Sequence, residues 1–131
     1  MVCLDSSFVI DLWRGDKAAV EMKNMLKQKG EDFFIPTLVV MELSTGAQLS
    51  RRADTEKQKI MQLLSESKIL DFDCESAFRA GEIRAELEKK NESIDSEDIM
   101  IGAIALQNNE SLVTRNIKHF EKISGLKIEK Y

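Results

Sequence analysis

The chain is poor in the residues that interrupt or cross-link a fold, since its 131 residues include one proline, two cysteines and six glycines. The single proline, Pro36, and the scarce glycines argue against long flexible loops. Cys3 and Cys74 lie in strand-like surroundings without Cys-x-x-Cys or Cys/His spacing. We therefore interpret both as small buried apolar residues, which argues against a disulfide framework and against a zinc site.

Long apolar runs are also missing. No run reaches the length of a membrane span, and residues 1–8 contain neither a basic region followed by a long apolar stretch nor a small-residue cleavage site. We expect no membrane span and no secretory signal, and hence a cytoplasmic protein. The composition, 43% hydrophobic and 32% charged, is typical of globular rather than disordered chains. The length predicts one domain over residues 1–131.

An excess of positive charge is absent too, since the net charge is −4. This argues against a non-specific nucleic-acid binder, whose domain is usually basic. Nucleic acid is not excluded, because acids that hold metal ions contribute to this balance while local cations can still follow a phosphate backbone. Candidate cations are Arg14, Arg115 and Lys118. The alternative for each is an ordinary solvated surface charge.

What the sequence does contain is an alternation of short apolar runs with longer segments of helical period. The runs at 2–4, 33–35, 68–72, 111–114 and 126–128 predict strands. Helices are predicted at 8–29, 37–50, 54–66, 75–90 and 96–108, with Gly30 as a stop and Thr37 as an N-cap. This alternation predicts an α/β fold, a three-layer α/β/α domain with a central parallel sheet of four to five strands.

Three carboxylates are set among apolar residues: Asp5 after the first run, Glu42 within the helix at 37–50, and Asp98 at the start of the helix at 96–108. An ionised carboxylate taken out of water is strongly destabilising unless a cation or hydrogen-bond donors compensate it. A divalent metal shared by all three is the simplest compensator. In an open parallel sheet, ligands bind beyond the carboxyl ends of the strands, where Asp5 is expected to lie.

Each carboxylate also has a purely structural interpretation. Asp5 can cap the helix that follows it, and Asp98 can complement a helix dipole. Against this, Asp98 shares one face with Gly102 on a helix that has almost no polar face, so Asp98 should point inward, with Gly102 allowing close packing beside it. For Asp95, one turn earlier, we favour helix capping over a fourth ligand.

The segment after the strand at 111–114 gathers polar side chains at the carboxyl end of that strand. Asn116 can hold a metal-bound water, or it can be a turn residue. His119 is the only histidine, and without a second imidazole or a cysteine it makes a poor zinc ligand set. A surface or packing role is therefore favoured for His119.

Four segments together resemble the PIN-domain ribonucleases, and more narrowly the VapC toxins. They are LDSSFVIDLWRG at 4–15, IPT at 35–37 with Glu42, Leu43 and Gly46, DIMIGA at 98–103, and LVTRN at 112–116. Motif order and spacing match over essentially the whole chain, which is far more specific than any one motif. The resemblance implies a PIN-like fold and a Mg²⁺- or Mn²⁺-dependent endoribonuclease, usually a homodimer and usually silenced by a VapB-type antitoxin encoded beside it.

The resemblance assigns the catalytic positions to Asp5, Glu42, Asp98 and Asn116. The three acids would bind the metal. The cations named above are among those nearest these motifs in the sequence, and for that reason we expect them to contact RNA phosphates. Ser7 and Thr114 match supporting hydroxyls. His119 stands where many members have an acid, so a second metal would lose a ligand, and we expect one tight metal with a second recruited mainly by the scissile phosphate.

The chemistry of the residues agrees with this reading. Carboxylate-rich sites suit Mg²⁺ or Mn²⁺, and a metal-activated water can hydrolyse a phosphodiester without a protein nucleophile. Two alternatives stay open. A phospho-acceptor signalling domain also uses carboxylates and Mg²⁺ at strand ends, but it groups an acidic pair after the first strand, where this chain has Asp5 alone. A catalytically weak PIN-like domain that only binds RNA or a partner is the other.

Overall fold

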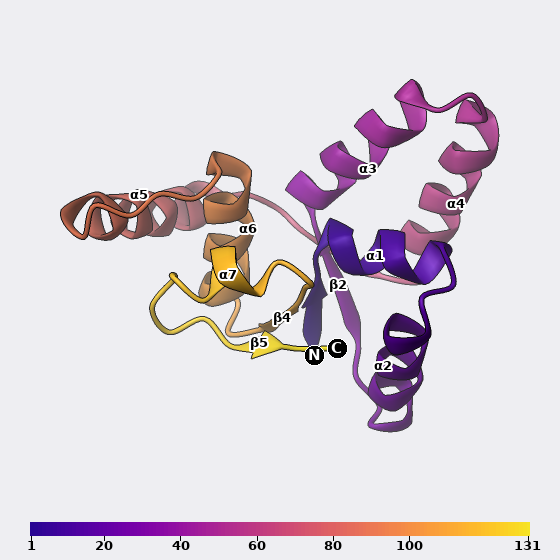
Figure 1. The fold of residues 1–131 in the computed structure, drawn as a ribbon, viewed down its shortest axis with the longest axis horizontal. Coiled ribbons are helices and arrows are strands. Elements are labelled where there is room, and N and C mark those ends of the chain that lie inside the picture. The colour runs from indigo at the N-terminus through magenta and orange to yellow at the C-terminus, as the bar shows by residue number, and fades with distance from the viewer.

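The computed structural model describes residues 1–131, which form one parallel sheet with helices on both faces (Figure 1). The strands are β1 (Val2–Leu4), β2 (Phe33–Pro36), β3 (Lys68–Leu70), β4 (Ser111–Val113) and β5 (Ile128–Glu129). The helices are α1 (Ser6–Trp13), α2 (Lys17–Gln28), α3 (Thr37–Leu49), α4 (Ala53–Ser65), α5 (Cys74–Lys89), α6 (Ser96–Gln107) and α7 (Ile117–Phe120). The predicted parallel-sheet α/β/α fold is confirmed.

The strand order is β3-β2-β1-β4-β5, with every neighbouring pair parallel. The chain therefore moves outward from β1 to β3, returns across the sheet, and moves outward again from β4 to β5. Right-handed crossovers place the helices of the two halves on opposite faces. Figure 1 shows this directly, with α1 to α4 on one side of the sheet and α5 to α7 on the other.

The core lies between these layers and explains why the short apolar runs become central strands. All three residues of β1 are buried, as are Leu112 and Val113 of β4. Strands covered on both faces need apolar side chains pointing both ways, so their sequences are continuous rather than alternating. Helix α6 is similarly apolar because it packs against β2, β4 and α3. Burial holds the short strands β1 and β4 in place, whereas the edge strand β3 is largely exposed.

Some boundaries differ from the sequence expectation. The helix predicted at 8–29 is two helices, because the chain turns at Gly15, whose φ of 75° favours glycine. Thr37 is the first residue of α3 rather than its cap. The Thr37 hydroxyl accepts a hydrogen bond from the Phe72 amide at 3.3 Å instead. Cys74 is exposed at the start of α5, so the expectation that it is buried in a strand was wrong.

Two smaller findings agree with the sequence. A Cβ added at Gly102 would lie 2.5 Å from Cδ1 of Ile123, so glycine lets the segment after α7 approach α6. Cys3 is buried in β1, and burial raises the pKa of its thiol to about 12, which keeps it protonated and unreactive. None of the seven helices combines the length and the apolar character that a membrane span requires.

Candidate metal centre

The site lies where the strand order reverses, between β1 and β4. The Asp5 amide donates to the Val113 carbonyl at 3.0 Å, so Asp5 leaves β1 next to the point where Thr114 leaves β4. Crevices at such a switch point collect the polar groups that follow neighbouring strands. Asp5 is 2% exposed and Thr114 is fully buried, so their polar atoms need partners within the protein.

Two hydroxyls supply those partners to Asp5. Ser7 Oγ donates to Asp5 Oδ2 at 3.0 Å, and Thr114 Oγ1 donates to the same oxygen at 2.7 Å. Each hydroxyl in turn accepts a backbone N–H, from Arg115 at 3.1 Å and from Asn116 at 3.0 Å. Because a hydroxyl has one proton, an N–H on its lone pair turns that proton toward the carboxylate. Both bonds end on Oδ2, which leaves Oδ1 of Asp5 for another ligand.

Glu42 enters the site from α3, with one of its oxygens in an unfavourable place. Its Oε1 is buried without a hydrogen-bond partner. Burial, followed by the neighbouring charges of Asp5 and Asp98, raises the pKa of Glu42 to about 7, although a hydrogen bond with Ser6 acts in the opposite direction. A buried carboxylate that has one unpartnered oxygen and two other carboxylates nearby is a position that a cation would stabilise.

Asp98 reaches the same space from the first turn of α6, on the other face of the sheet. It is 8% exposed, and His119 Nδ1 lies 2.8 Å from its Oδ2. Burial raises the pKa of Asp98, the contact with His119 lowers it, and the charge of Asp5 raises it again. The three predicted acids are therefore close enough to act on one another electrostatically, although they come from α3, α6 and the end of β1.

Asp95 and His119 also belong to this cluster. Ligand atoms of Asp95, Asp98 and His119 lie within 4.8 Å of one another, as ligands of a single ion would. Asp95 occupies the N-cap position of α6, but its side chain accepts no capping hydrogen bond, so the expected capping role was wrong. His119, expected on the surface or in packing, faces Asp98 from α7.

The donor set fits a divalent metal. Asp5, Glu42 and Asp98 are carboxylates within electrostatic reach of one another, and Oε1 of Glu42 has no hydrogen-bond partner. The ligand atoms that lie within reach of a single ion are those of Asp95, Asp98 and His119. Oxygen-rich sites of this kind suit Mg²⁺ or Mn²⁺. His119 adds a nitrogen, which Mn²⁺ accepts more readily than Mg²⁺ does.

The other predicted residues surround this centre. Asn116 is exposed as the N-cap of α7, and Lys118 is exposed on α7 itself. Arg14 ends α1 and lines a cavity of about 330 Å³ together with Glu42. Arg115 extends along α1, where its Nη1 donates to Asp11 Oδ1 at 2.9 Å.

Two residues of the site region have no counterpart in the sequence expectation. Asp11 is 5% exposed on α1, and Tyr131 donates its hydroxyl proton to Asp11 Oδ2 at 2.6 Å. The available signal was the position of Asp11 four residues after Ser7, which places both side chains on one face of a helix. Nothing in the local sequence around Tyr131 indicates that it returns to α1.

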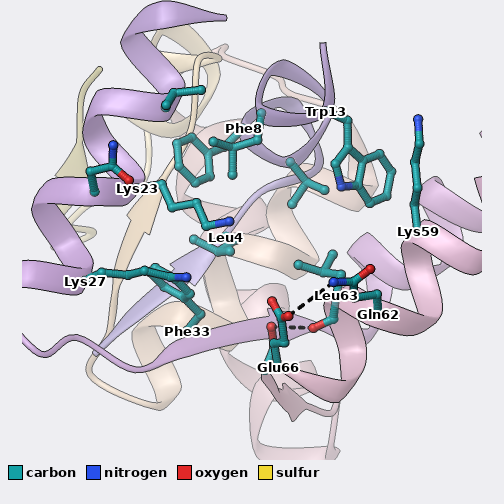
Figure 2. A pocket seen from close by; sticks show the side chains of 15 residues that line it. Leu4, Phe8, Trp13, Lys23, Lys27, Phe33, Lys59, Gln62, Leu63 and Glu66 are labelled. Atoms are coloured by element: carbon teal, nitrogen blue, oxygen red, sulfur yellow. Dashed lines mark hydrogen bonds between the residues drawn. The ribbon is translucent and has the colours of Figure 1, made fainter. Parts of the chain in front are cut away.

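A second, larger concavity lies on the other side of α1, between α2, α4 and the sheet. Its volume is about 600 Å³, and Phe8, Leu63 and Phe33 contribute apolar walls. Figure 2 shows Lys23 and Lys27 of α2 reaching over it. Lys59 of α4 closes the opposite rim, 5.9 Å from the centre of the Trp13 ring.

Comparison with known proteins finds one family. The PIN domain family profile matches residues 2–126. Ribonuclease VapC2 of Rickettsia felis is 35% identical over 106 residues, which are 81% of this chain and 79% of that protein. The tRNA(fMet)-specific endonuclease VapC of Salmonella typhimurium is 34% identical over 95 residues, which are 72% of each protein.

Solved structures share the fold over nearly the whole length. The crystal structure of VapBC2 from Rickettsia felis bound to a DNA fragment from its promoter matches with a TM-score of 0.90 at 29% identity, covering 100% of this chain and 99% of that chain. DNA-bound VapBC from Salmonella typhimurium matches with a TM-score of 0.87 at 28% identity, covering 99% and 98%.

Proposed function

Because this chain belongs to the PIN-domain family, and within it to the VapC group, we propose that it is a metal-dependent endoribonuclease that acts as the toxin of a toxin–antitoxin pair. The names of its relatives, ribonuclease and tRNA endonuclease, support RNA as the substrate. The observation that carries the catalytic part of the proposal is the buried, unpartnered Oε1 of Glu42, a carboxylate whose pKa is raised by the nearby charges of Asp5 and Asp98.

In this proposal, Asp5, Glu42 and Asp98 hold one Mg²⁺ or Mn²⁺ ion. Such an ion, when bound, lowers the pKa of water and neutralises charge on the phosphate being cut. Ser7 and Thr114 hold one oxygen of Asp5 in place through their hydroxyl protons, so that the other oxygen faces the ion. Positioning of this kind matters because ligands must be held close to their working geometry before substrate arrives.

The remaining residues bind and orient the substrate. Asn116, exposed beside Thr114, can hold a water next to the scissile phosphate. Arg14, Arg115 and Lys118 are the cations placed around the carboxylates, and we assign them to the RNA backbone. Contacts to phosphates carry no sequence information by themselves, so they supply affinity rather than choice of target.

Asp95, Asp98 and His119 would hold a second ion. His119 would then serve as the ligand at the position where many members of the family have an acid. The mixed oxygen and nitrogen donors of this set favour Mn²⁺ over Mg²⁺. We propose that occupancy of this second position depends on the metal supplied, with Mn²⁺ giving the doubly loaded form.

The partner is a VapB-type antitoxin. The related structures are VapBC complexes, which supports a partner of this kind. We assign its docking segment to the concavity of Figure 2, because apolar walls and a lysine rim together suit a segment with apolar side chains flanked by acids. Lys23, Lys27 and Lys59 would then face the acidic flank.

We also propose a homodimer. Large apolar side chains are exposed on α3 and α4, namely Met41 (49%), Leu49 (83%) and Met61 (60%). Exposed apolar surface of this kind commonly marks an interface. Light scattering of the isolated chain gives its mass in solution, and a monomer at all concentrations would contradict the dimer.

The deciding experiment is cleavage of mixed-sequence RNA by purified protein with Mn²⁺ or Mg²⁺, compared with an EDTA control. Asp5→Asn keeps the shape of the side chain and removes its charge, and we expect the rate to fall about a thousandfold, because an ion supplies several kcal/mol to such a reaction. Glu88→Gln, an exposed substitution on α5, should leave the rate unchanged. Wild-type protein that binds RNA or its partner but never cuts RNA would instead favour a PIN-like binding domain.

A further inference from the structure

One charged group near the metal centre has no role in the function proposed so far. Asp11 lies on α1 with its side chain 8% exposed, yet it is not among the acids that converge on Glu42. A buried carboxylate persists only where donors or a cation compensate it. The partners of Asp11 therefore indicate what the carboxylate is for.

Both partners come from the C-terminal part of the chain, one after β4 and the other after β5. Arg115 Nη1 donates to Asp11 Oδ1 at 2.9 Å, and Tyr131 Oη donates to Asp11 Oδ2 at 2.6 Å. Tyr131 is itself fixed, with its ring packed edge-on against Phe8 at 5.0 Å between centroids. Burial and the hydrogen bond to Asp11 raise the pKa of the Tyr131 hydroxyl, so it stays a proton donor.

The arrangement constrains Arg115 at two points. Its backbone N–H donates to Ser7 Oγ at 3.1 Å, and its guanidinium is tied to Asp11, one helical turn further along α1. Only one of its guanidinium nitrogens is engaged, and the side chain remains 59% exposed. A guanidinium carries five N–H donors, so most of them stay available on the open side.

We propose that Asp11 and Tyr131 are positioning residues that hold the Arg115 guanidinium over α1, one turn from Ser7, ready to receive a phosphate of the RNA backbone. This inference rests on the ribonuclease function proposed above. Fixing a long cationic side chain before RNA arrives removes part of the entropy that binding would otherwise lose. Arg115 is the residue that contacts RNA, and Asp11 and Tyr131 act through it.

The positioning role can be tested by neutralising Asp11, because a positioning role and a purely electrostatic role predict opposite changes in RNA affinity. An acid near the RNA path repels phosphate, so its neutralisation should tighten binding if the acid acts only through its charge. If Asp11 holds Arg115 in place, the same neutralisation should weaken binding. Tyr131→Phe carries no charge change and removes only the hydroxyl, leaving the ring on Phe8.

The test uses the full chain carrying Asp5→Asn, which binds RNA without cutting it, and a fluorescent single-stranded RNA of mixed sequence. Anisotropy between about 50 and 200 mM salt gives the Kd and its salt dependence. Arg115→Ala should raise the Kd about tenfold and flatten the salt slope by about 0.7, the loss of one phosphate contact. We expect Asp11→Asn to raise the Kd about threefold and Tyr131→Phe about twofold, since each loosens the arginine without removing it.

A double-mutant cycle separates positioning from general stability. When Arg115→Ala is already present, adding Asp11→Asn should no longer raise the Kd, because the residue it positions is gone. Glu88→Gln on the exposed side of α5 is the matched charge control and should tighten binding slightly. If Asp11→Asn behaves like Glu88→Gln, or weakens binding equally with and without Arg115, the positioning role is wrong.

Two further outcomes complete the experiment. Should Asp11→Asn fail to give a cooperative melting transition, Tyr131→Phe decides, and an unchanged Kd for that variant overturns the proposal. Failure of the ribonuclease function looks different. It would appear as no cleavage by the chain that keeps Asp5, whereas failure of the positioning role leaves wild-type cleavage intact.

Discussion

Helix α1 separates two surfaces of opposite chemistry. On one side Asp5, just before the helix, and Ser7 and Asp11 within it face the metal centre and Arg115. On the other side, Phe8 and Leu12 line the concavity of Figure 2 under a rim of lysines, while Trp13 at the end of the helix borders both this concavity and the cavity that contains Glu42. The first surface concentrates negative charge that the fold compensates only in part, and the second exposes an apolar hollow that the fold leaves open.

The difference shows that the two surfaces contribute to stability in opposite ways. Removing a charge from the carboxylate side relieves repulsion and desolvation, so the empty site is less stable than a neutralised one. Removing a group from the hollow only loses contacts or attraction for a partner. A metal ion should therefore change the ranking of variants on the first surface and have no effect on those of the second.

The largest expected effect is metal stabilisation of the wild type. A hundredfold excess of Mg²⁺ or Mn²⁺ over its Kd should raise the free energy of unfolding by about 2.7 kcal/mol, or the melting temperature by roughly 10 °C. Glu42→Gln should lose most of this shift, whereas Lys23→Glu in the hollow should keep it. Thermal melts with metal and with EDTA measure both, and equal shifts in all three proteins would remove Glu42 from the ligand set.

In EDTA, Glu42→Gln should be more stable than the wild type, and the difference in the free energy of unfolding should depend on pH. The pKa of Glu42 is raised to about 7 from 4.5, so the folded state binds its proton more tightly than the unfolded state does. Its contribution to stability is then complete below pH 4.5 and is lost as pH rises through 7. The raised pKa of Asp98 acts in the same direction.

Glu42→Gln removes the Glu42 part of this pH dependence. A shift of that size corresponds to about 3 kcal/mol at most, and solvent access to the site reduces the expected difference to roughly 2 kcal/mol at pH 8. Metal-free wild type and Glu42→Gln should have similar stability at pH 4.5 and diverge above it. Urea denaturation of both proteins across this pH range gives the measurement. A constant difference in the free energy of unfolding at all pH values would contradict the raised pKa of Glu42.

A smaller effect is expected when a lysine at the rim of the hollow is replaced by an acid, which reverses its charge. Lys23→Glu and Lys27→Glu should each weaken binding of the proposed VapB-type antitoxin by roughly three- to tenfold, mainly through slower association. RNA cleavage without the antitoxin should stay at the wild-type rate. Measuring RNA cleavage at increasing antitoxin concentrations gives both the cleavage rate and the strength of inhibition for each variant. Inhibition equal to that of the wild type would mean that the antitoxin binds elsewhere.

The smallest effect concerns Lys59, which pairs with Glu56 at 3.2 Å and lies over the Trp13 ring. Both contacts are partly exposed, so Lys59→Met should lower the free energy of unfolding by only about 0.5 kcal/mol, and no more in EDTA than with metal. Chemical denaturation in both conditions measures this. A metal-dependent loss would mean that the two sides of α1 are coupled.

Much of the fold was predictable because its signals are local. The apolar runs of β1 and β4 and the nearly continuous apolar sequence of α6 follow directly from burial within the layers of the fold. The break at Gly15 was missed because both halves of the predicted helix keep an apolar period, and one glycine with positive φ redirects the chain between them.

The site was predictable in a more limited way. Asp5, Glu42 and Asp98 stand out in the sequence because each is a charge among apolar residues, and the structure brings them together. His119 and Asp95 do not stand out, since a lone histidine and a helix-capping acid are common on surfaces. Their closeness to Asp98 depends on how α7 packs against α6, which no local pattern encodes.

The placement of β1 at the centre of the sheet affects how the protein is made. Val2 pairs with both Phe33 and Ser111, and Asp5 finds its donor Thr114 more than a hundred residues later in the chain. At translation rates of roughly 5–20 residues per second, the first strand waits several seconds for its second neighbour. A nascent chain therefore cannot complete the surroundings of Asp5 until β4 and Thr114 have left the ribosome.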